Sequence, residues 1–282
     1  EVILHLAALV SVQESIERPA LNFELNVRCV HNVIEAVRRA GVRRLVFASS
    51  AAVYGEPERL PLDEQAAVRP LSPYGAAKLA GEDLILSAAR GSGFEAVCLR
   101  YFNIYGPRQC GQSPYSSVVS RFLQALRDGC APVIYGDGRQ TRDFVHVRDV
   151  ARANLLATRA MAPLTAVFNI CTGREVTLNQ LAAILSGSFP AAQAPKFAAA
   201  RSSDIHRSVG DPNRAKETLG FAAGTALNSG LGEIAHAIDE SGLSTQSSTR
   251  VDPRHPKTLV RENAGAENRV PMRSELRKNS DT

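Results

Sequence analysis

A short apolar run that ends in two serines constrains the fold of this chain more than any other segment. Residues 43–50 read Arg-Arg-Leu-Val-Phe-Ala-Ser-Ser, which is typical of a strand buried on both faces of a parallel sheet. Ser72 and Pro73 predict the start of a later helix, with Ser72 as N-cap and Pro73 at the first helical position. A strand end and a helix start of this kind meet where open α/β sheets bind ligands.

The wider pattern of apolar segments predicts an α/β fold. Strand-like segments at 2–7, 43–49 and 95–101 alternate with helical segments at 19–40 and 73–90. This order predicts a parallel sheet with right-handed crossovers, as in a Rossmann-like doubly wound domain. Later segments predict helices at 115–128, 148–160, 177–186, 212–219 and 226–239, and strands at 132–135, 143–146 and 166–170.

The same pattern divides the chain into parts. We expect residues 1–110 to form the remainder of a dinucleotide-binding domain, to which a strand and a helix return from about 132–170. Residues 111–241 are mainly a smaller C-terminal substrate-binding subdomain. Residues 242–282 are rich in Ser, Thr, Asn, Pro and Arg and poor in aromatics, which predicts a disordered tail.

Tyr74 and Lys78 are four residues apart and therefore share one face of the predicted helix. A free phenol titrates near ~10 and is a poor base at neutral pH. A nearby ammonium and a helix N-terminus both favour the phenolate, so we expect a lowered pKa for Tyr74. Such a phenol can take a proton from a substrate hydroxyl, with Ser50 relaying it. A Tyr-x-x-x-Lys pair arises by chance in many helices, but the strand-end serine and the proline-initiated helix favour the catalytic interpretation.

At these residues the chain resembles the extended short-chain dehydrogenase/reductase superfamily, and within it the nucleotide-sugar 4-epimerases. The resemblance runs from residue 1 to about residue 240 and is carried by several segments in the family order. These are His5-Leu6-Ala7-Ala8, Asn26-Val27, Ser49-Ser50-Ala51-Ala52-Val53-Tyr54-Gly55, Ser72-Pro73-Tyr74-Gly75 with Lys78, Leu99-Arg100-Tyr101-Phe102-Asn103, Tyr105-Gly106-Pro107-Arg108, Gly136-Asp137-Gly138 and Thr141-Arg142-Asp143-Phe144-Val145-His146-Val147.

The resemblance implies a set of site residues. It makes Ser50, Tyr74 and Lys78 the catalytic residues. It implies an NAD cofactor contacted by Leu6, Ala7, Ala8, Asn26, Ser49, Tyr74, Lys78 and Phe102, with Lys78 on the nicotinamide ribose. It implies a UDP-sugar substrate contacted by Ser50, Tyr74, Asn103, Ser117, Val118, Val133, Tyr135, Arg142, Arg201, Asp204 and Ser208. Arginine forks suit the two phosphates of such a substrate, although an arginine is more simply a solvated surface charge.

Two positions bear on the reaction within the family. Ala51 and Ala52 follow Ser50, where related dehydratases and decarboxylases carry carboxylates, and this favours simple 4-epimerisation. Ser208 occupies a position that gates the pocket at the sugar's C2 substituent, and a small residue there favours UDP-GlcNAc and UDP-GalNAc. The alternatives are a 4-epimerase for UDP-glucose or UDP-glucuronate, a nucleotide-sugar dehydratase, and an inactive truncated relative or non-catalytic binding protein.

The first residues lack the phosphate-binding turn of a dinucleotide fold. We find no Gly-x-Gly-x-x-Gly turn between a strand and a helix. The Gly91-Ser92-Gly93 triplet precedes a strand, and Gly136-Asp137-Gly138 lacks the third glycine. We expect roughly 60–80 residues to be missing at the front, from the size of two βα units. The hypothesis that follows is that the chain binds NAD weakly or not at all and could be inactive.

Charge and cysteine content limit the other functions. The net charge is +5, and eight basic against five acidic residues after residue 241 supply most of it, so we expect neither nucleic-acid nor membrane binding. The five cysteines show no paired spacing and the six histidines no metal-ligand spacing, which predicts no zinc site and fits a cytoplasmic protein. By analogy with relatives, helices 19–40 and 73–90 would form the interface of a homodimer.

Overall fold

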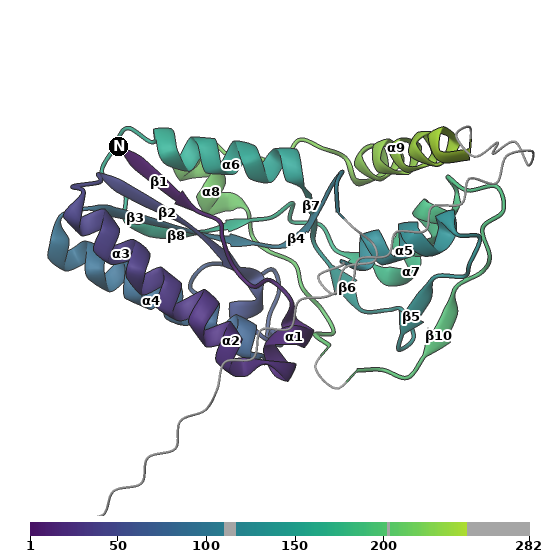
Figure 1. Cartoon of the computed structure of the whole chain (residues 1–282), viewed down its shortest axis with the longest axis horizontal. Helices are drawn as coiled ribbons and strands as arrows, with labels where there is room; N and C mark the ends of the chain where they lie inside the picture. The colour runs from purple at the N-terminus through teal and green to yellow at the C-terminus, as the bar shows by residue number, and fades with distance from the viewer. Residues whose placement is uncertain (110–116, 202–203, 247–282) are drawn as a thin grey trace, which may run out of the picture.

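The computed structural model describes residues 1–109, 117–201 and 204–246, and confirms the α/β fold (Figure 1). Its main sheet is parallel and has the order β1-β2-β3-β8. The strands are β1 (Val2–His5), β2 (Arg44–Ser50), β3 (Glu95–Tyr101) and β8 (Ala166–Ile170). In β2 the residues from Arg44 to Ser49 are all buried, as the unbroken apolar run predicts.

Helices cover both faces of this sheet (Figure 1). The helices α3 (Cys29–Arg39) and α4 (Pro73–Ser92) lie on one face, and α6 (Val147–Arg159) and α8 (Asn213–Leu219) on the other. Each face buries an apolar core, one containing Val30, Ile34, Phe47, Ile85 and Cys98, the other Val46, Leu99, Ala153, Phe168 and Leu219. The doubly wound arrangement follows from burial of the sheet on both sides.

The predicted helix 19–40 is divided in the structure. It consists of α2 (Pro19–Phe23), a π-helical turn (Glu24–Arg28) and α3, and it is preceded by α1 (Val12–Glu17). Asn22 and Asn26 are 3% and 2% exposed, and the Asn26 amide donates to Asn22 Oδ1 at 2.7 Å. From this divided segment the Asn26 amide bonds Leu9 in the loop after β1, and the Asn22 amide donates to Pro73 O.

The second part of the chain is built from helices and short strands. α5 (Val118–Arg127), α7 (Leu178–Ser186) and α9 (Leu227–Gln246) pack around a core that includes Phe122, Leu123, Leu181, Leu185 and Leu231. Three strand pairs accompany them: β4 (Asn103–Tyr105) with β7 (Phe144–His146), β5 (Val133–Tyr135) with β10 (Lys196–Ala198), and β6 (Thr141–Arg142) with β9 (Val176–Thr177).

Two expected boundaries differ from the structure. Helix α9 continues to Gln246, so residues 242–246 belong to a helix rather than to the predicted tail, and residues 247–282 lie outside the described part. Within 132–170, α6 and β8 return to the main sheet as expected, but β5 pairs with β10 instead.

A buried carboxylate joins the two parts. Asp143 is 0% exposed. It accepts hydrogen bonds from the Thr172 amide at 2.8 Å, the Thr172 hydroxyl at 2.6 Å and the Gly173 amide at 2.9 Å. Burial raises the Asp143 pKa, against these hydrogen bonds. The end of strand β6, which carries the neighbouring Arg142, is thereby fixed to the carboxyl end of β8.

In the described ranges, no helix has the length and apolar character needed to cross a membrane. The same residues contain no group of His, Cys, Asp or Glu that could hold a metal ion. Cys29, Cys98, Cys130 and Cys171 are free thiols, and Cys110 lies outside the described residues.

Candidate active site

A cavity of about 810 Å³ opens at the carboxyl ends of β2 and β3, between the main sheet and the second part of the chain. Most of the residues predicted from the sequence line it. They are Leu6, Ala8, Ser49, Ser50, Tyr74, Lys78, Phe102, Asn103, Ser117, Val118, Val133, Tyr135, Arg142, Arg201 and Asp204. Segments far apart in the chain therefore converge on one site, as the strand-end argument predicts.

Three predicted residues do not face the cavity. Ala7, Asn26 and Ser208 are absent from the described residues that line it. Asn26 donates to Leu9 O at 2.8 Å and accepts from Leu9 N at 2.9 Å, so its amide shapes the loop that carries Ala8. Ser208 is 8% exposed, and its packing in the interior explains why it does not reach the cavity.

The start of α4 holds Tyr74 in place. Ser72 Oγ accepts from Gly75 N at 3.1 Å, and Pro73 occupies the first turn, as predicted. Tyr74 N donates to the buried Ser15 Oγ at 3.1 Å, and Asn22 Nδ2 donates to Pro73 O at 3.0 Å. The first turn of α4 is therefore clamped by buried side chains of α1 and α2.

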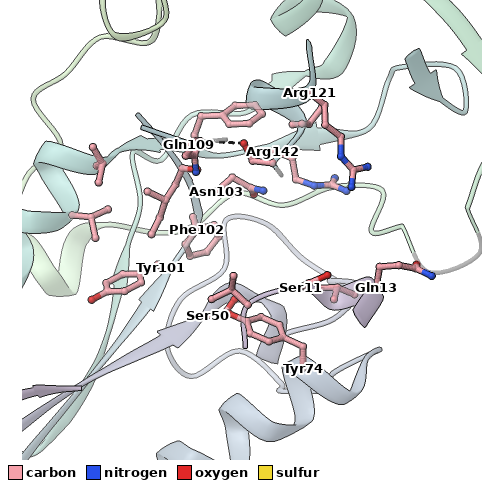
Figure 2. Close-up of a pocket in the computed structure, with 18 of the residues that line it drawn as sticks. Ser11, Gln13, Ser50, Tyr74, Tyr101, Phe102, Asn103, Gln109, Arg121 and Arg142 are labelled. Atoms are coloured by element: carbon pink, nitrogen blue, oxygen red, sulfur yellow. Dashed lines mark hydrogen bonds between the residues drawn. The ribbon is translucent and has the colours of Figure 1, made fainter. Parts of the chain in front are cut away.

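Tyr74 and Ser50 form the centre of the site. Their side chains lie side by side in the cavity (Figure 2). The expectation that the Tyr74 pKa is lowered is wrong for this structure. Burial raises the Tyr74 pKa because lost hydration penalises the phenolate, and the neighbouring Ser50 hydroxyl acts on this pKa in the opposite direction.

Lys78 is 3% exposed, and burial lowers its pKa to about 8. Its Nζ lies 5.8 Å from the centre of the Tyr74 ring and donates to Ala48 O at 2.8 Å. An ammonium has three donors, so two remain for a ligand. With the small side chain of Ala8 and the apolar Leu6 beside it, this donor set fits the nicotinamide-ribose end of NAD.

Basic groups gather at the opposite end of the cavity. Arg142 is half-buried, and its Nη1 donates to Thr141 O at 2.8 Å and to Ile205 O at 2.7 Å. Burial lowers the Arg142 pKa, against the charge of Asp204. The Arg201 guanidinium lies 3.7 Å from the centre of the Tyr135 ring. These groups can receive a phosphorylated ligand.

Several side chains of the cavity wall were not predicted from the sequence. Gln13, Gln109, Arg121 and Gln140 line the cavity, and Figure 2 shows Arg121 directed to the same region as Arg142. Gln109 Oε1 accepts from the Ser117 hydroxyl at 3.2 Å. The position of Arg121 four residues after Ser117, on the helix turn that faces the cavity, is the signal that could have identified it.

The parallel sheet and the Ser50–Tyr74–Lys78 set define a Rossmann-like enzyme domain of the short-chain dehydrogenase/reductase type. The model of the NAD dependent epimerase/dehydratase family matches residues 1–171, and the chain belongs to this family. NAD is accordingly its cofactor class, as the sequence resemblance implied.

Individual relatives agree with this assignment. A putative UDP-glucose 4-epimerase of Methanocaldococcus jannaschii is 38% identical over 237 residues, which are 84% of this chain and 76% of that protein. A UDP-glucose 4-epimerase structure from Thermotoga maritima, with UDP-glucose, has a TM-score of 0.82 at 35% identity and covers 86% of this chain and 78% of that one. A UDP-N-acetylglucosamine 4-epimerase structure from Methanobrevibacter ruminantium has a TM-score of 0.80 at 33% identity and covers 86% and 77%.

Proposed function

We propose that this protein catalyses the NAD-dependent 4-epimerisation of UDP-glucose and UDP-galactose. The observation that carries the proposal is the placement of Ser50 and Tyr74 side by side with the buried Lys78, at one end of a cavity whose other end holds Arg142 and Arg201. The curated relatives described above favour UDP-glucose over the UDP-GlcNAc that Ser208 indicates in the sequence.

The chain's own residues supply binding and proton transfer. Arg142 and Arg201 hold the diphosphate, and Asn103 lies between Arg142 and the Ser50–Tyr74 pair (Figure 2). Tyr74 Oη takes the proton from the O4 hydroxyl of the sugar and returns it after the sugar has turned over. Ser50 donates to the same oxygen. When bound, NAD⁺ supplies the hydride acceptor and a positive charge that opposes the rise in the Tyr74 pKa.

The residues after Ser50 favour epimerisation over elimination. Ala51 and Ala52 form a short 3₁₀ turn with Val53, and Ser50 Oγ accepts from Ala52 N at 3.2 Å. Neither alanine can remove a further proton from the sugar. The 4-keto sugar should therefore be reduced again at C4 and should not lose water.

Proton NMR of UDP-glucose incubated with the protein and millimolar NAD⁺ tests this proposal. The anomeric signal of UDP-galactose should grow to a constant ratio with that of UDP-glucose. The Tyr74→Phe variant should lower the rate by about 10²–10⁴-fold, the usual contribution of general acid–base catalysis. Normal turnover by this variant would refute the mechanism, and a 4-keto-6-deoxy product would show a dehydratase instead.

UDP-GlcNAc is the second candidate substrate. It is favoured by the likeness to the M. ruminantium UDP-N-acetylglucosamine 4-epimerase, at 33% identity. The same NMR assay with UDP-GlcNAc decides between the two sugars, because each substrate gives its own product signal. Faster conversion of UDP-GlcNAc than of UDP-glucose would replace the leading substrate and leave the mechanism unchanged.

A further inference from the structure

A buried ion pair lies directly behind the catalytic side chains. Glu82 is 1% exposed and Arg100 is 5% exposed. Arg100 Nε donates to Glu82 Oε1 at 2.9 Å, and Arg100 Nη2 donates to Glu82 Oε2 at 2.7 Å. Glu82 Oε1 also accepts a hydrogen bond from the hydroxyl of Ser49, which is 2% exposed. The mechanism described above uses neither charge.

The pair connects helix α4 to two neighbouring strands of the main sheet. Glu82 belongs to α4, Ser49 to β2 and Arg100 to β3, and Ser49 and Arg100 are paired residues of the two parallel strands. Arg100 is further fixed by the Tyr54 ring, whose centre lies 4.8 Å from its Cζ. Removing one member of a buried pair leaves an uncompensated charge, so this arrangement tolerates little displacement.

The contacts of α4 with β2 form a regular series. Tyr74, Lys78 and Glu82 are spaced four residues apart and lie on one helix face. The Tyr74 side chain lies beside Ser50 (Figure 2), Lys78 donates to Ala48 O at 2.8 Å, and Glu82 accepts from Ser49. Successive turns of α4 thus bind the last residues of β2, and only the first of these turns carries the reacting group.

We propose that Glu82, held by Arg100, is a positioning residue that sets the alignment of α4 against the end of β2 and so keeps the Tyr74 side chain beside Ser50. This inference deepens the proposed function and rests on it. Arg100 holds the Glu82 carboxylate, the carboxylate holds the Ser49 hydroxyl, and Ser49 immediately precedes Ser50 in the strand. The Ser49 proton is committed to Glu82, so its oxygen can only accept from a group in the cavity.

A second arginine–glutamate pair, in which the Glu95 side chain is 19% exposed, lies at the opposite end of the same strands and provides a control. Arg44 is 0% exposed, and its Nε donates to Glu95 Oε2 at 2.5 Å. Arg44 and Glu95 are paired residues of β2 and β3, far along both strands from the cavity. Glu82→Gln and Glu95→Gln therefore make the same chemical change in two arginine–glutamate pairs, one on α4 beside the cavity and one at the far end of β2 and β3.

The test compares kcat, KM and the ¹³Cζ NMR signal of Tyr74 at one pH, assigned by its loss in Tyr74→Phe. Glu82→Gln and Ser49→Ala should lower kcat about tenfold with KM within twofold, since small misplacements of reacting groups are costly. Both should shift the Tyr74 signal in the direction that Ser50→Ala shifts it, and Ser49→Thr, which keeps the hydroxyl, should restore both values. Glu95→Gln should lower the Tm and leave kcat and the Tyr74 signal unchanged.

Equal losses of kcat in the Glu82→Gln and Glu95→Gln variants, or an unmoved Tyr74 signal in Glu82→Gln and Ser49→Ala, would overturn the inference. If Glu82→Gln does not fold, Ser49→Ala decides, because it leaves the ion pair intact. An absence of turnover in the wild type would defeat the proposed function, and the Tyr74 signal would then still decide the alignment on its own.

Discussion

At the scale of single residues, Arg142 is the side chain best prepared for a phosphate. Two backbone carbonyls fix one side of its guanidinium, so its remaining donors are preorganised for an anion. Arg142→Ala should weaken binding of UDP about 10–100-fold, which corresponds to ~1.5–3 kcal/mol for a charge-assisted hydrogen bond. Calorimetry with UDP measures this without turnover.

Arg139→Ala is the matched control for that measurement. The Arg139 side chain is 86% exposed and lies 3.8 Å from Asp137, and it does not line the main cavity among the described residues. The Arg139→Ala variant should bind UDP with the same affinity as the wild type. Equal losses in both variants would show that the effect is the general charge of the surface and not a contact with the diphosphate.

Ser208 gives a second prediction at this scale. The side chain is buried and has no face on the cavity wall among the described residues, so Ser208→Tyr should act by overpacking, at ~1–3 kcal/mol. The variant should then reduce turnover of UDP-glucose and UDP-GlcNAc by the same factor and lower the Tm. A selective loss of UDP-GlcNAc turnover in the NMR assay would instead support the sequence-based prediction that Ser208 lies at the sugar's C2 substituent and selects between substrates.

The residues that the sequence located correctly lie at the ends of long elements. Ser50, Tyr74 and Lys78 follow from one strand end and one helix start, since their placement needs only local structure. The pKa of Tyr74 and the contacts of Asn26 and Ser208 depend on burial and on partners distant in the chain. No local pattern carries that information, so the expected lowering of the Tyr74 pKa was wrong, and the ligand contacts of Asn26 and Ser208 stay predictions.

At the scale of elements, α4 approaches the turn after Ser50 through Gly75. A Cβ at Gly75 would lie 2.6 Å from Ala52 O, a backbone atom, so Gly75→Ala forces the first turn of α4 away from Ser50. We expect a loss of ~1–3 kcal/mol of unfolding free energy from overpacking and a lower kcat, measured by denaturant unfolding and by the NMR assay.

Gly91→Ala in the same helix is the control for this prediction. A Cβ at Gly91 meets nothing within 4 Å, so the substitution should stabilise the helix by ~0.5–1 kcal/mol and leave kcat unchanged. If Gly75→Ala kept its wild-type kcat while losing stability, the close approach of α4 would serve packing alone.

Elements differ in how far they can be predicted. The strands β2, β3 and β8 and the long helices α4 and α6 follow from extended apolar patterns; β3 and β8 have the expected ends, and the ends of the others differ by at most two residues. The strands β4 and β10 have three residues each, too few for a period to be visible. Their strand conformation depends on pairing with β7 and β5. This pairing depends on the tertiary fold and leaves no local pattern in the sequence of β4 or β10.

At the scale of the whole molecule, the site depends on the junction between the main sheet and the second part of the chain. The sheet supplies the Ser50–Tyr74–Lys78 set, and the second part supplies Arg142 and Arg201. Asp143 holds the two together through Thr172 and Gly173. The sequence predicts both parts, but the way they meet follows from a buried carboxylate whose partners lie about 30 residues further along the chain.

The stability of the whole molecule should fall as the pH drops below about 6.5, the unfolded value for histidine. His5 and His146 are 8% and 1% exposed, and burial is the main cause that lowers the pKa of each below 6.5. The unfolded chain therefore binds protons first, so stability is full above about pH 6.5 and is lost as the pH falls towards the folded pKa values.

The Tm measured between pH 8 and pH 5.5 tests this, with His146→Asn as the informative variant. His146 Nδ1 caps α6 by accepting from Arg148 N at 3.2 Å, and Asn keeps a capping acceptor while removing the titration. Each histidine can contribute at most ~1.4 kcal/mol per pH unit, so the variant should show a shallower fall of Tm than the wild type, even if its Tm at pH 8 is lower.

The raised pKa values of Glu64 and Asp143 act with the opposite sign in both proteins and cancel in the comparison. Parallel pH profiles would mean that His146 protonates equally easily in the folded and unfolded chains.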